Sequence, residues 1–276
     1  TVDFITPVVD DPYVYGQIAA ANSLSDVFAM GGDVLNALNL VGFDGCNHDK
    51  VLLKDILAGG ESKVRECGGV ITGGQTPEMY YGLSVTGTVH PQKFWRNNTP
   101  RVGDVLILTK PLGLGVLSTA IKADMLSDKE ALEAANVMAQ LNFKASQILR
   151  NFDVSACTDV TGFGLLGHGL EMAGEHATLV FDRGNIPVLQ SAKEQADMGI
   201  IPAGTYANKH YVEPFLTCKD AVDILLYDAQ TSGGLLVALR ERDVQAVLNE
   251  LNDAGYVYSF VVGHVASRAS KQLIIL

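Results

Sequence analysis

Short apolar runs alternate with stretches of helical periodicity along the chain, and this alternation restricts the fold to a mixed α/β architecture. Residues 14–28 and 50–67 carry apolar side chains at helical spacing, and the Gly59-Gly60 pair is expected to interrupt the second helix. The order of elements predicts an α/β (α+β) fold. Strand-like runs lie at residues 4–9, 34–43, 70–72 and 83–89. The runs at 4–9, 35–43 and 83–89 are too few and too apolar to make a closed sheet alone, and an open apolar edge needs a partner to cover it, which favours a homodimer.

A polar, aperiodic stretch at residues 94–100 separates this pattern from a second one. We therefore expect two domains, residues 1–100 and 101–276. The second half again alternates both element types. Its expected helices lie at 116–123, 129–152, from Gly162 onward and at 243–254, and its expected strands lie at 105–108, up to Thr158, and at 179–181, 235–239, 256–262 and 273–276.

Charge and composition disfavour several classes of partner and location. The chain has 276 residues with 20 basic and 31 acidic side chains, and its formal net charge of −11 disfavours a nucleic acid or an anionic membrane as partner. No apolar run approaches the roughly 18–20 residues of a membrane span. The four cysteines form no C-x-x-C pair, so we expect small buried residues of a cytoplasmic protein.

Three aspartates lie at positions that suit a metal-binding site. Asp3 lies near a strand start, Asp26 follows on the helix that also carries Asn22, and Asp159 occupies a strand-to-helix turn. If the three converge, their oxygens suit Mg²⁺ better than zinc, which prefers nitrogen and sulfur ligands. Each also has a simpler explanation, because Asp159 resembles a helix cap and Asp26 suits a residue that faces water.

Two glycine-containing turns add further polar positions. The first comprises Gly73, Gly74, Gln75 and Thr76. It follows a strand and could direct backbone amides toward a phosphate, although the P-loop pattern is absent and a Gly-Gly pair is commonly an ordinary turn. The second turn, residues 231–234, is by itself typical of an ordinary loop. His168, between two glycines, suits a structural role better than that of a general base.

Charge repulsion links the phosphate and metal hypotheses. Two like unit charges about 4 Å apart cost on the order of 4 kcal/mol at an effective dielectric constant of 20, so aspartates alone cannot hold ATP. Divalent cations that bridge carboxylate and phosphate oxygens reverse the sign of this energy. If this chain binds a nucleotide, we therefore expect it to bind Mg²⁺ as well.

Several longer blocks of sequence are more specific than any single residue. They are TVDF at 1–4, DDP at 10–12, ANSLSDVFAMGG at 21–32, GGQT at 73–76, LTKPLG at 108–113, TDVTGFGLLGH at 158–168 and QTSGGLL at 230–236. Together they closely resemble the selenophosphate synthetase (selenide, water dikinase) family, within the aminoimidazole ribonucleotide synthetase superfamily. The similarity runs from the first residue to the last.

The resemblance implies a two-domain α/β fold whose N-terminal halves pair into a homodimer. It also implies an ATP-dependent reaction in which selenide and water yield selenophosphate, AMP and orthophosphate. The residues that match the family's Mg²⁺ ligands are Asp3, Asp26 and Asp159. The matching nucleotide-binding positions are Asp3, Asp26, Gly73, Gly74, Gln75 and Thr76, to which Asn22 and Ser25 add polar contacts from the same helix.

The sequence departs from the family at its N-terminus. Family members carry an upstream glycine-rich segment with a cysteine or selenocysteine and a lysine, and none of the four cysteines here matches that motif. We therefore expect the catalytic residues in an N-terminal segment missing from this chain, which would be an inactive or weakly active core. Two alternatives stay open: a catalytically silent nucleotide-binding paralogue, and a superfamily enzyme acting on a purine or thiamine precursor.

Overall fold

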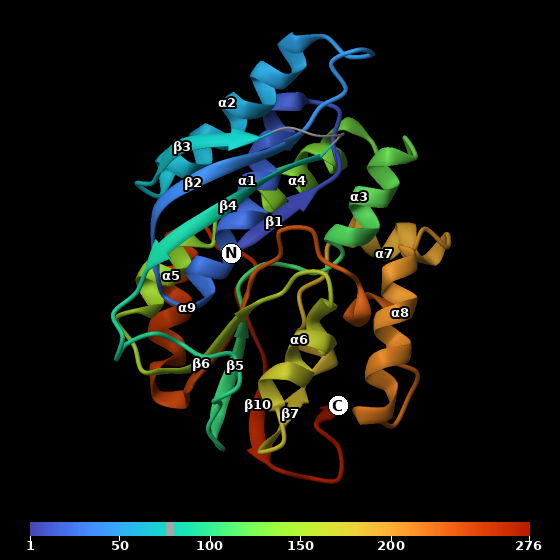
Figure 1. Ribbon diagram of the computed structural model, residues 1–276. Coiled ribbons are helices and arrows are strands. Elements are labelled where there is room, and N and C mark those ends of the chain that lie inside the picture. The colour runs from blue at the N-terminus through green and yellow to red at the C-terminus, as the bar shows by residue number, and fades with distance from the viewer. Residues whose placement is uncertain (76–79) are drawn as a thin grey trace. The chain divides into compact units, whose positions relative to one another are not determined.

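A computed structural model describes residues 1–75 and 80–276. These residues form two compact units, Thr1–Phe94 with Ala120–Phe143 and Trp95–Thr119 with Lys144–Leu276 (Figure 1). We expected the first domain to end at residue 100. Helix α4 (Asp128–Ala139) lies beyond that residue in the sequence, yet it belongs to the first unit because it packs against α1 (Pro12–Ala29). Helices and strands alternate in both units, so the predicted α/β class is confirmed.

The described part of the first unit contains a four-stranded sheet with the order β1-β4-β2-β3. Its strands are β1 (Val2–Ile5), β2 (Asp33–Gly42), β3 (Val70–Gln75) and β4 (Tyr80–Thr88). Strand β4 runs antiparallel to both β1 and β2, whereas β2 and β3 are parallel. Strand β1 ends earlier than the sequence predicted, before Pro7, which has no N–H to donate to a ladder.

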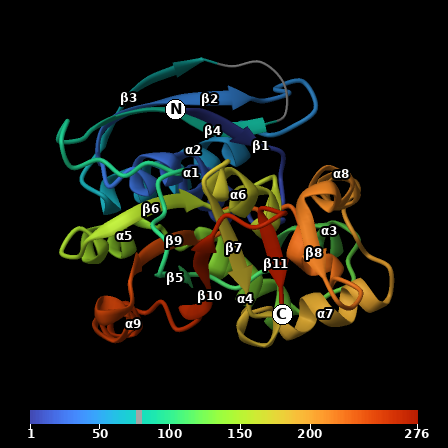
Figure 2. The same ribbon diagram turned by 90° about the horizontal axis from the view of Figure 1, so that it is seen from below.

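Helices α1 and α2 (Lys50–Glu66) lie on one face of this sheet (Figure 2). Helix α1 begins after Asp11, whose carboxylate caps it by accepting hydrogen bonds from the amides of Tyr13 at 2.9 Å and Val14 at 3.0 Å. Pro12 occupies the first turn, where its missing N–H costs nothing. Because α1 also contacts β1, its residues 22–26 lie near Asp3.

Helices α1 and α2 approach so closely that glycine is required at their contact. A Cβ atom at Gly16 would lie 2.0 Å from the Ile56 carbonyl oxygen, and one at Gly59 would lie 2.0 Å from the Tyr13 carbonyl oxygen. Helix α2 continues through Gly59 and Gly60, so the prediction that this pair interrupts the helix was wrong. The glycines permit close packing and do not break the helix.

We expect Gly16→Ala to lower the free energy of unfolding by about 1–3 kcal/mol, because the added methyl forces two backbones apart. Urea unfolding followed by circular dichroism measures the change. Gly184→Ala is the matched control, since a Cβ there meets only the Asp182 carboxylate, at 3.5 Å, and should change stability by less than about 1 kcal/mol. Equal stability of the two variants would contradict the packing argument.

The second unit contains a seven-stranded sheet with the order β6-β9-β5-β10-β7-β11-β8 among the described residues. Its strands are β5 (Asp104–Leu108), β6 (Val154–Asp159), β7 (Ala177–Phe181), β8 (Leu216–Cys218), β9 (Leu235–Arg240), β10 (Phe260–Ser267) and β11 (Leu273–Ile275). Neighbours are antiparallel except in the β7-β11-β8 part. The sequence analysis missed β8, which is only three residues long.

Helices flank this sheet. They are α5 (Phe143–Leu149), α6 (Gly164–Ala173), α7 (Gln190–Asp197), α8 (Ala203–Val212) and α9 (Val244–Asp253), while α3 (Leu114–Lys122) crosses from the second unit into the first. Short 3₁₀ turns occupy Arg183–Asn185, Glu213–Phe215, Ile224–Tyr227 and Glu241–Asp243. Helix α6 packs against β6 and β7, with Leu165, Leu166 and Phe181 fully buried in the core.

Two boundaries in this half differ from the sequence predictions. The helical pattern at 129–152 is two helices, because the backbone becomes extended at Gln140 before α5 starts. Strand β10 begins four residues later than expected. Tyr256 is instead a buried anchor after α9, where its hydroxyl accepts a hydrogen bond from the Ala145 amide at 3.1 Å.

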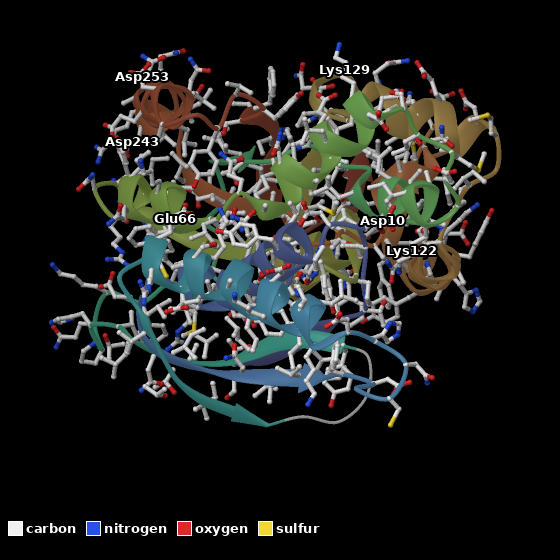
Figure 3. All side chains as sticks on the ribbon, turned by 90° about the horizontal axis from the view of Figure 1, so that it is seen from above. Asp10, Glu66, Lys122, Lys129, Asp243 and Asp253 are labelled. Atoms are coloured by element: carbon white, nitrogen blue, oxygen red, sulfur yellow. The ribbon has the colours of Figure 1, made fainter. Side chains whose placement is uncertain are left out.

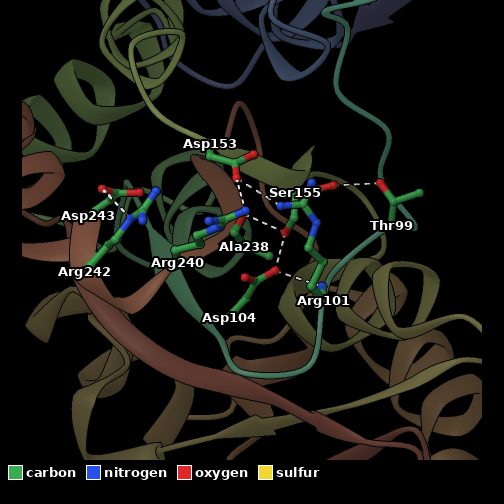
Figure 4. A network of polar contacts seen from close by, with 9 residues as sticks. All are labelled: Thr99, Arg101, Asp104, Asp153, Ser155, Ala238, Arg240, Arg242 and Asp243. Carbon is green, nitrogen blue, oxygen red and sulfur yellow. Dashed lines mark hydrogen bonds and ion pairs between the residues drawn. The ribbon is translucent and has the colours of Figure 1, made fainter.

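A polar network ties the start of β5 to the start of β6 (Figure 4). The buried carboxylate of Asp104 accepts a hydrogen bond from the Arg101 amide at 2.8 Å and another from the Ser155 hydroxyl. Arg101 and Arg240 both pair with Asp153, at 3.1 and 2.8 Å. These contacts link the start of β6 to the start of β5, next to the register shift of the β6–β9 ladder between Val154 and Ala156, and Asp159 lies at the opposite end of β6.

Several charged side chains lie at the surface. Lys129 near the start of α4 and Asp253 at the end of α9 are exposed and point outward (Figure 3). The prediction of buried cysteines was only partly right, because Cys67 and Cys157 are buried whereas Cys46 is exposed. Among the residues described, no helix has both the length and the apolar character of a membrane span.

Candidate functional site

Asp3 is held between its own strand and helix α1. It pairs with Leu83 across the β1–β4 ladder and therefore shares the sheet face that α1 covers. Its carboxylate accepts hydrogen bonds from the Phe4 amide at 2.8 Å and from the side-chain amide of the buried Asn22. Asn22 thus supports Asp3 through a neutral donor, which leaves the carboxylate's charge uncompensated.

Asp26 lies one helical turn beyond Asn22 and is exposed. Its carboxylate accepts a hydrogen bond from the Thr1 hydroxyl. Burial raises the pKa of Asp3 above its ordinary value, and the negative charge of Asp26 raises it further. Asp3 and Asp26 therefore form a pair of mutually repelling carboxylates, and a hard divalent cation such as Mg²⁺ suits these oxygen donors.

A cavity of about 240 Å³ opens beside Asp26. Its walls come from the end of α1 and from β4, including Met30, Val85 and Thr88. Ligand pockets usually measure about 300–1,000 Å³, so this cavity alone is too small for a whole nucleotide.

Ser25 takes a structural role. It is fully buried, and its hydroxyl accepts a hydrogen bond from the Asn142 side chain at 2.9 Å. Asn142 follows helix α4, so this bond anchors the returning segment 120–143 to α1. Ser25 therefore supports the helix that carries Asn22 and Asp26.

The first glycine motif forms a strand end. Gly73, Gly74 and Gln75 continue β3 and pair with residues 38–40 of β2, so the expected turn at these three positions was wrong. Gly74 lies so close to β2 that a Cβ atom would meet the Asn39 carbonyl oxygen at 2.6 Å. Thr76 lies outside the described residues.

Asp159 is the last residue of β6, in the second unit. Strand β9 runs antiparallel to both β5 and β6, and its Leu236 pairs with Leu108 on one side and with Thr158 on the other. The ends of β5 and β6 therefore flank the start of β9. Asp159 is 6% exposed and does not cap α6, whose N-cap position, Phe163, carries no side-chain cap.

The loop after Asp159 is fixed on two sides. The Val160 amide donates to the Gly234 carbonyl at 2.8 Å, and the Thr161 carbonyl accepts from the Gln230 amide at 3.0 Å. On the other side, Nε2 of His168 accepts a hydrogen bond from the Thr161 amide at 3.1 Å. His168 thus holds the loop in place, which is the structural role that its sequence context predicted.

Another buried carboxylate, Asp228, lies under the start of α3. Its Oδ2 accepts from the amides of Gly115 at 3.0 Å and Val116 at 3.3 Å and from the Gln230 side chain, and its Oδ1 accepts from the Thr205 hydroxyl. Despite these bonds, burial raises the pKa of Asp228 to about 6. Asp228 was not predicted from the sequence, where its signal was the polar run DAQTS that leads into the second turn.

We expect Asp228 to make stability depend on pH. The folded protein binds this proton more tightly than the unfolded chain, so the carboxyl's stabilising contribution is complete below about pH 4 and is lost as the pH rises through 6. Asp228→Asn removes the titration. The difference in unfolding free energy between wild type and variant should therefore fall by about 3 kcal/mol from pH 4 to pH 7.

Urea unfolding at several pH values measures that difference. The exposed Asp253→Asn is the matched control and should show no such trend. A constant difference between wild type and Asp228→Asn across the range would show that Asp228 titrates normally.

Among the described residues, no three His, Cys, Asp or Glu side chains gather as a metal site of their own. The candidate donors predicted from the sequence are instead the Asp3–Asp26 pair of the first unit and Asp159 of the second. Mg²⁺ is commonly held by one or two carboxylates together with substrate phosphates, so a pair fits this ion without a larger protein cage.

Comparison with known families covers both units. Residues 1–90 match the AIR synthase related protein, N-terminal domain, and residues 101–275 match the AIR synthase related protein, C-terminal domain. The selenide, water dikinase of Aliarcobacter butzleri is 52% identical over 282 residues, which cover 100% of this chain and 82% of that protein. The chain belongs to the selenide, water dikinase family. The Campylobacter jejuni member is 48% identical over 278 residues, covering 100% of this chain and 82% of that protein.

Solved structures share the fold at low identity. The hydrogenase maturation protein HypE has a TM-score of 0.79 at 18% identity, covering 100% of this chain and 84% of that one. Thiamine-monophosphate kinase from Stenotrophomonas maltophilia has a TM-score of 0.72 at 15% identity, with coverage of 100% and 84%. These similarities show the fold alone.

Proposed function

We propose that the chain catalyses ATP-dependent phosphoryl transfer to selenide, giving selenophosphate, AMP and orthophosphate. Conversion of ATP to AMP releases two phosphoryl groups, of which one forms a bond to selenium and the other is transferred to water. The observation that carries the proposal is the repelling Asp3–Asp26 pair, found in a chain with 52% identity to a selenide, water dikinase. Two carboxylates that repel each other favour a metal-bound polyphosphate over free phosphate.

In this proposal Asp3, Asp26 and Asp159 ligate Mg²⁺, and Asn22 orients Asp3. When bound, Mg²⁺ neutralises the charge on the phosphate oxygens during transfer. The side-chain amide of Asn22 donates to Asp3, which fixes the direction of the carboxylate. Gly73, Gly74, Gln75 and Thr76 are proposed as nucleotide contacts, because glycine at the end of β3 lets backbone approach a phosphate closely.

Two alternative functions can be distinguished from this one by experiment. One is a nucleotide-binding protein without turnover, and the other is an ATP-dependent enzyme for a purine or thiamine precursor. Solved structures of the same fold include HypE in complex with ATP and a thiamine-monophosphate kinase with AMPPCP and TMP. Nucleotide binding is therefore common to all three candidates, whereas turnover and the phosphoryl acceptor distinguish them. We propose a cytoplasmic location for each.

Phosphorus NMR tests the reaction. The chain is incubated with ATP and Mg²⁺, with and without selenide, and the products are followed over time. The proposal predicts that selenophosphate and AMP form only when selenide is present, at the low rate expected of a chain whose four cysteines do not match the family's selenium-handling motif. ATP binding without selenide-dependent products would support the silent paralogue, and phosphorylation of thiamine monophosphate would support the kinase alternative.

We expect Asp26→Asn and Asp159→Asn each to weaken Mg²⁺·ATP binding by about tenfold or more, because each change removes one anionic ligand. Isothermal titration calorimetry measures the affinity, and thermal unfolding checks the fold. Asp253→Asn is the control because it removes the same charge from an exposed site. Wild-type affinity in both variants would overturn the assignment of these aspartates.

We further propose that the chain forms a homodimer through the first unit's sheet. The face opposite α1 and α2 exposes apolar side chains, namely Val2, Phe4, Leu35, Leu38 and Val70, which are 42–63% exposed. A contiguous apolar surface of this kind marks an interaction site.

Leu38→Lys should therefore convert a dimer of about 59 kDa, twice the chain mass of 29.4 kDa, into a monomer, because it places a charge in that face. Multi-angle light scattering at micromolar concentration measures the mass. Leu132→Lys is the control, since Leu132 is an exposed leucine of α4. A monomeric wild-type chain would refute the dimer.

A further inference from the structure

Lys110 is a buried lysine just beyond the end of β5. Its side chain is 1% exposed, and its Nζ donates a hydrogen bond to the Ser232 carbonyl at 2.8 Å. Lysine is almost never fully buried unless its charge has a partner, because removing an ammonium from water is costly. The position of Lys110 therefore calls for a physical explanation beyond packing.

The turn that Lys110 holds lies between the ends of two strands. A Cβ atom at Gly233 would lie 2.0 Å from the Val160 carbonyl oxygen, and one at Gly234 would lie 2.4 Å from the Lys110 amide nitrogen. The Gly234 carbonyl also accepts the Val160 amide at 2.8 Å. Residues 232–234 thus touch Lys110 on one side and the residue after Asp159 on the other.

Ser232 itself has an unfavourable backbone conformation. Its φ angle is +51°, in the left-handed region that residues other than glycine rarely adopt. Such a conformation persists only where its surroundings enforce it, and the hydrogen bond from Lys110 to the Ser232 carbonyl is one such constraint. Loss of that bond would allow the turn, and with it Val160, to relax.

We propose that Lys110 is a positioning residue for Asp159: its ammonium group locks residues 232–234 against Val160 and thereby fixes the Asp159 carboxylate for a divalent cation. The inference rests on the proposed metal role of Asp159. Strand pairing supports it, because Thr109 and Asp159 flank the same residue, Leu235, whose backbone bonds to Thr109 at 3.0 and 2.8 Å. Lys110 acts through the turn and need not touch the substrate.

Lys110→Met tests the proposal, because methionine keeps an unbranched apolar side chain and removes the donor. The dissociation constant of Mg²⁺·AMPPCP, measured by calorimetry, should rise about tenfold, in the range found when supports of metal ligands are removed. Thermal unfolding checks that the variant is folded, and the double-mutant cycle described below separates a positioning role from a general loss of structure. Lys144→Met, an exposed lysine of the same unit, should match wild type.

A double-mutant cycle separates this inference from the proposed function. In the Asp159→Asn background, Lys110→Met should have little further effect, because its action passes through Asp159. Wild-type affinity of Lys110→Met beside a weakened Asp159→Asn, or effects that multiply in the double variant, would overturn the positioning role. Wild-type affinity of Asp159→Asn would instead overturn the metal role of Asp159, and the inference with it.

A second pair of variants covers the case in which Lys110→Met does not fold. Lys110→Arg keeps the charge and the donors, whereas Lys110→Gln keeps one shorter neutral donor. The arginine variant should bind Mg²⁺·AMPPCP more tightly than the glutamine variant. Equal, wild-type affinity of both would overturn the proposal.

Discussion

Repulsion between negative charges is the constraint on which this account depends. Burial and the charge of Asp26 both raise the pKa of Asp3, and Asn22 supports Asp3 with a neutral amide that leaves this charge in place. Like charges about 4 Å apart cost on the order of 4 kcal/mol at an effective dielectric constant of 20, so in the proposed function this pair disfavours a bare polyphosphate. In the same proposal, a divalent cation makes these carboxylates a binding site for nucleotide.

In the second unit, strand direction determines where Asp159 lies. Because β9 runs antiparallel to both of its neighbours, β5 and β6 end at the same edge, and the glycine turn at 233–234 fits between those ends. The network around Asp104 links these strands at their other end. Asp159 is thus placed by the whole sheet, which suits a ligand that must hold its position without a metal.

Sequence periodicity predicted the fold class and most elements, because helical and strand patterns are local properties. It failed where long-range packing decides: Gly59 looks like a helix break but allows α1 to approach α2, and Gly73 looks like a turn but pairs with β2. Asn22 and Asp3 are 19 residues apart in the sequence, and their hydrogen bond depends on the contact between β1 and α1. Lys110 lay within a motif that the sequence analysis quoted, yet its role depends on Ser232, 122 residues away.

The location of the metal tests this account most directly. A crystal of the chain grown with Mn²⁺ and AMPPCP, measured at the manganese absorption edge, would locate each ion from its anomalous scattering. We expect peaks ligated by the carboxylates of Asp3, Asp26 and Asp159 and by phosphate oxygens of the nucleotide. Well-occupied manganese on the nucleotide that touches none of these carboxylates would contradict the account.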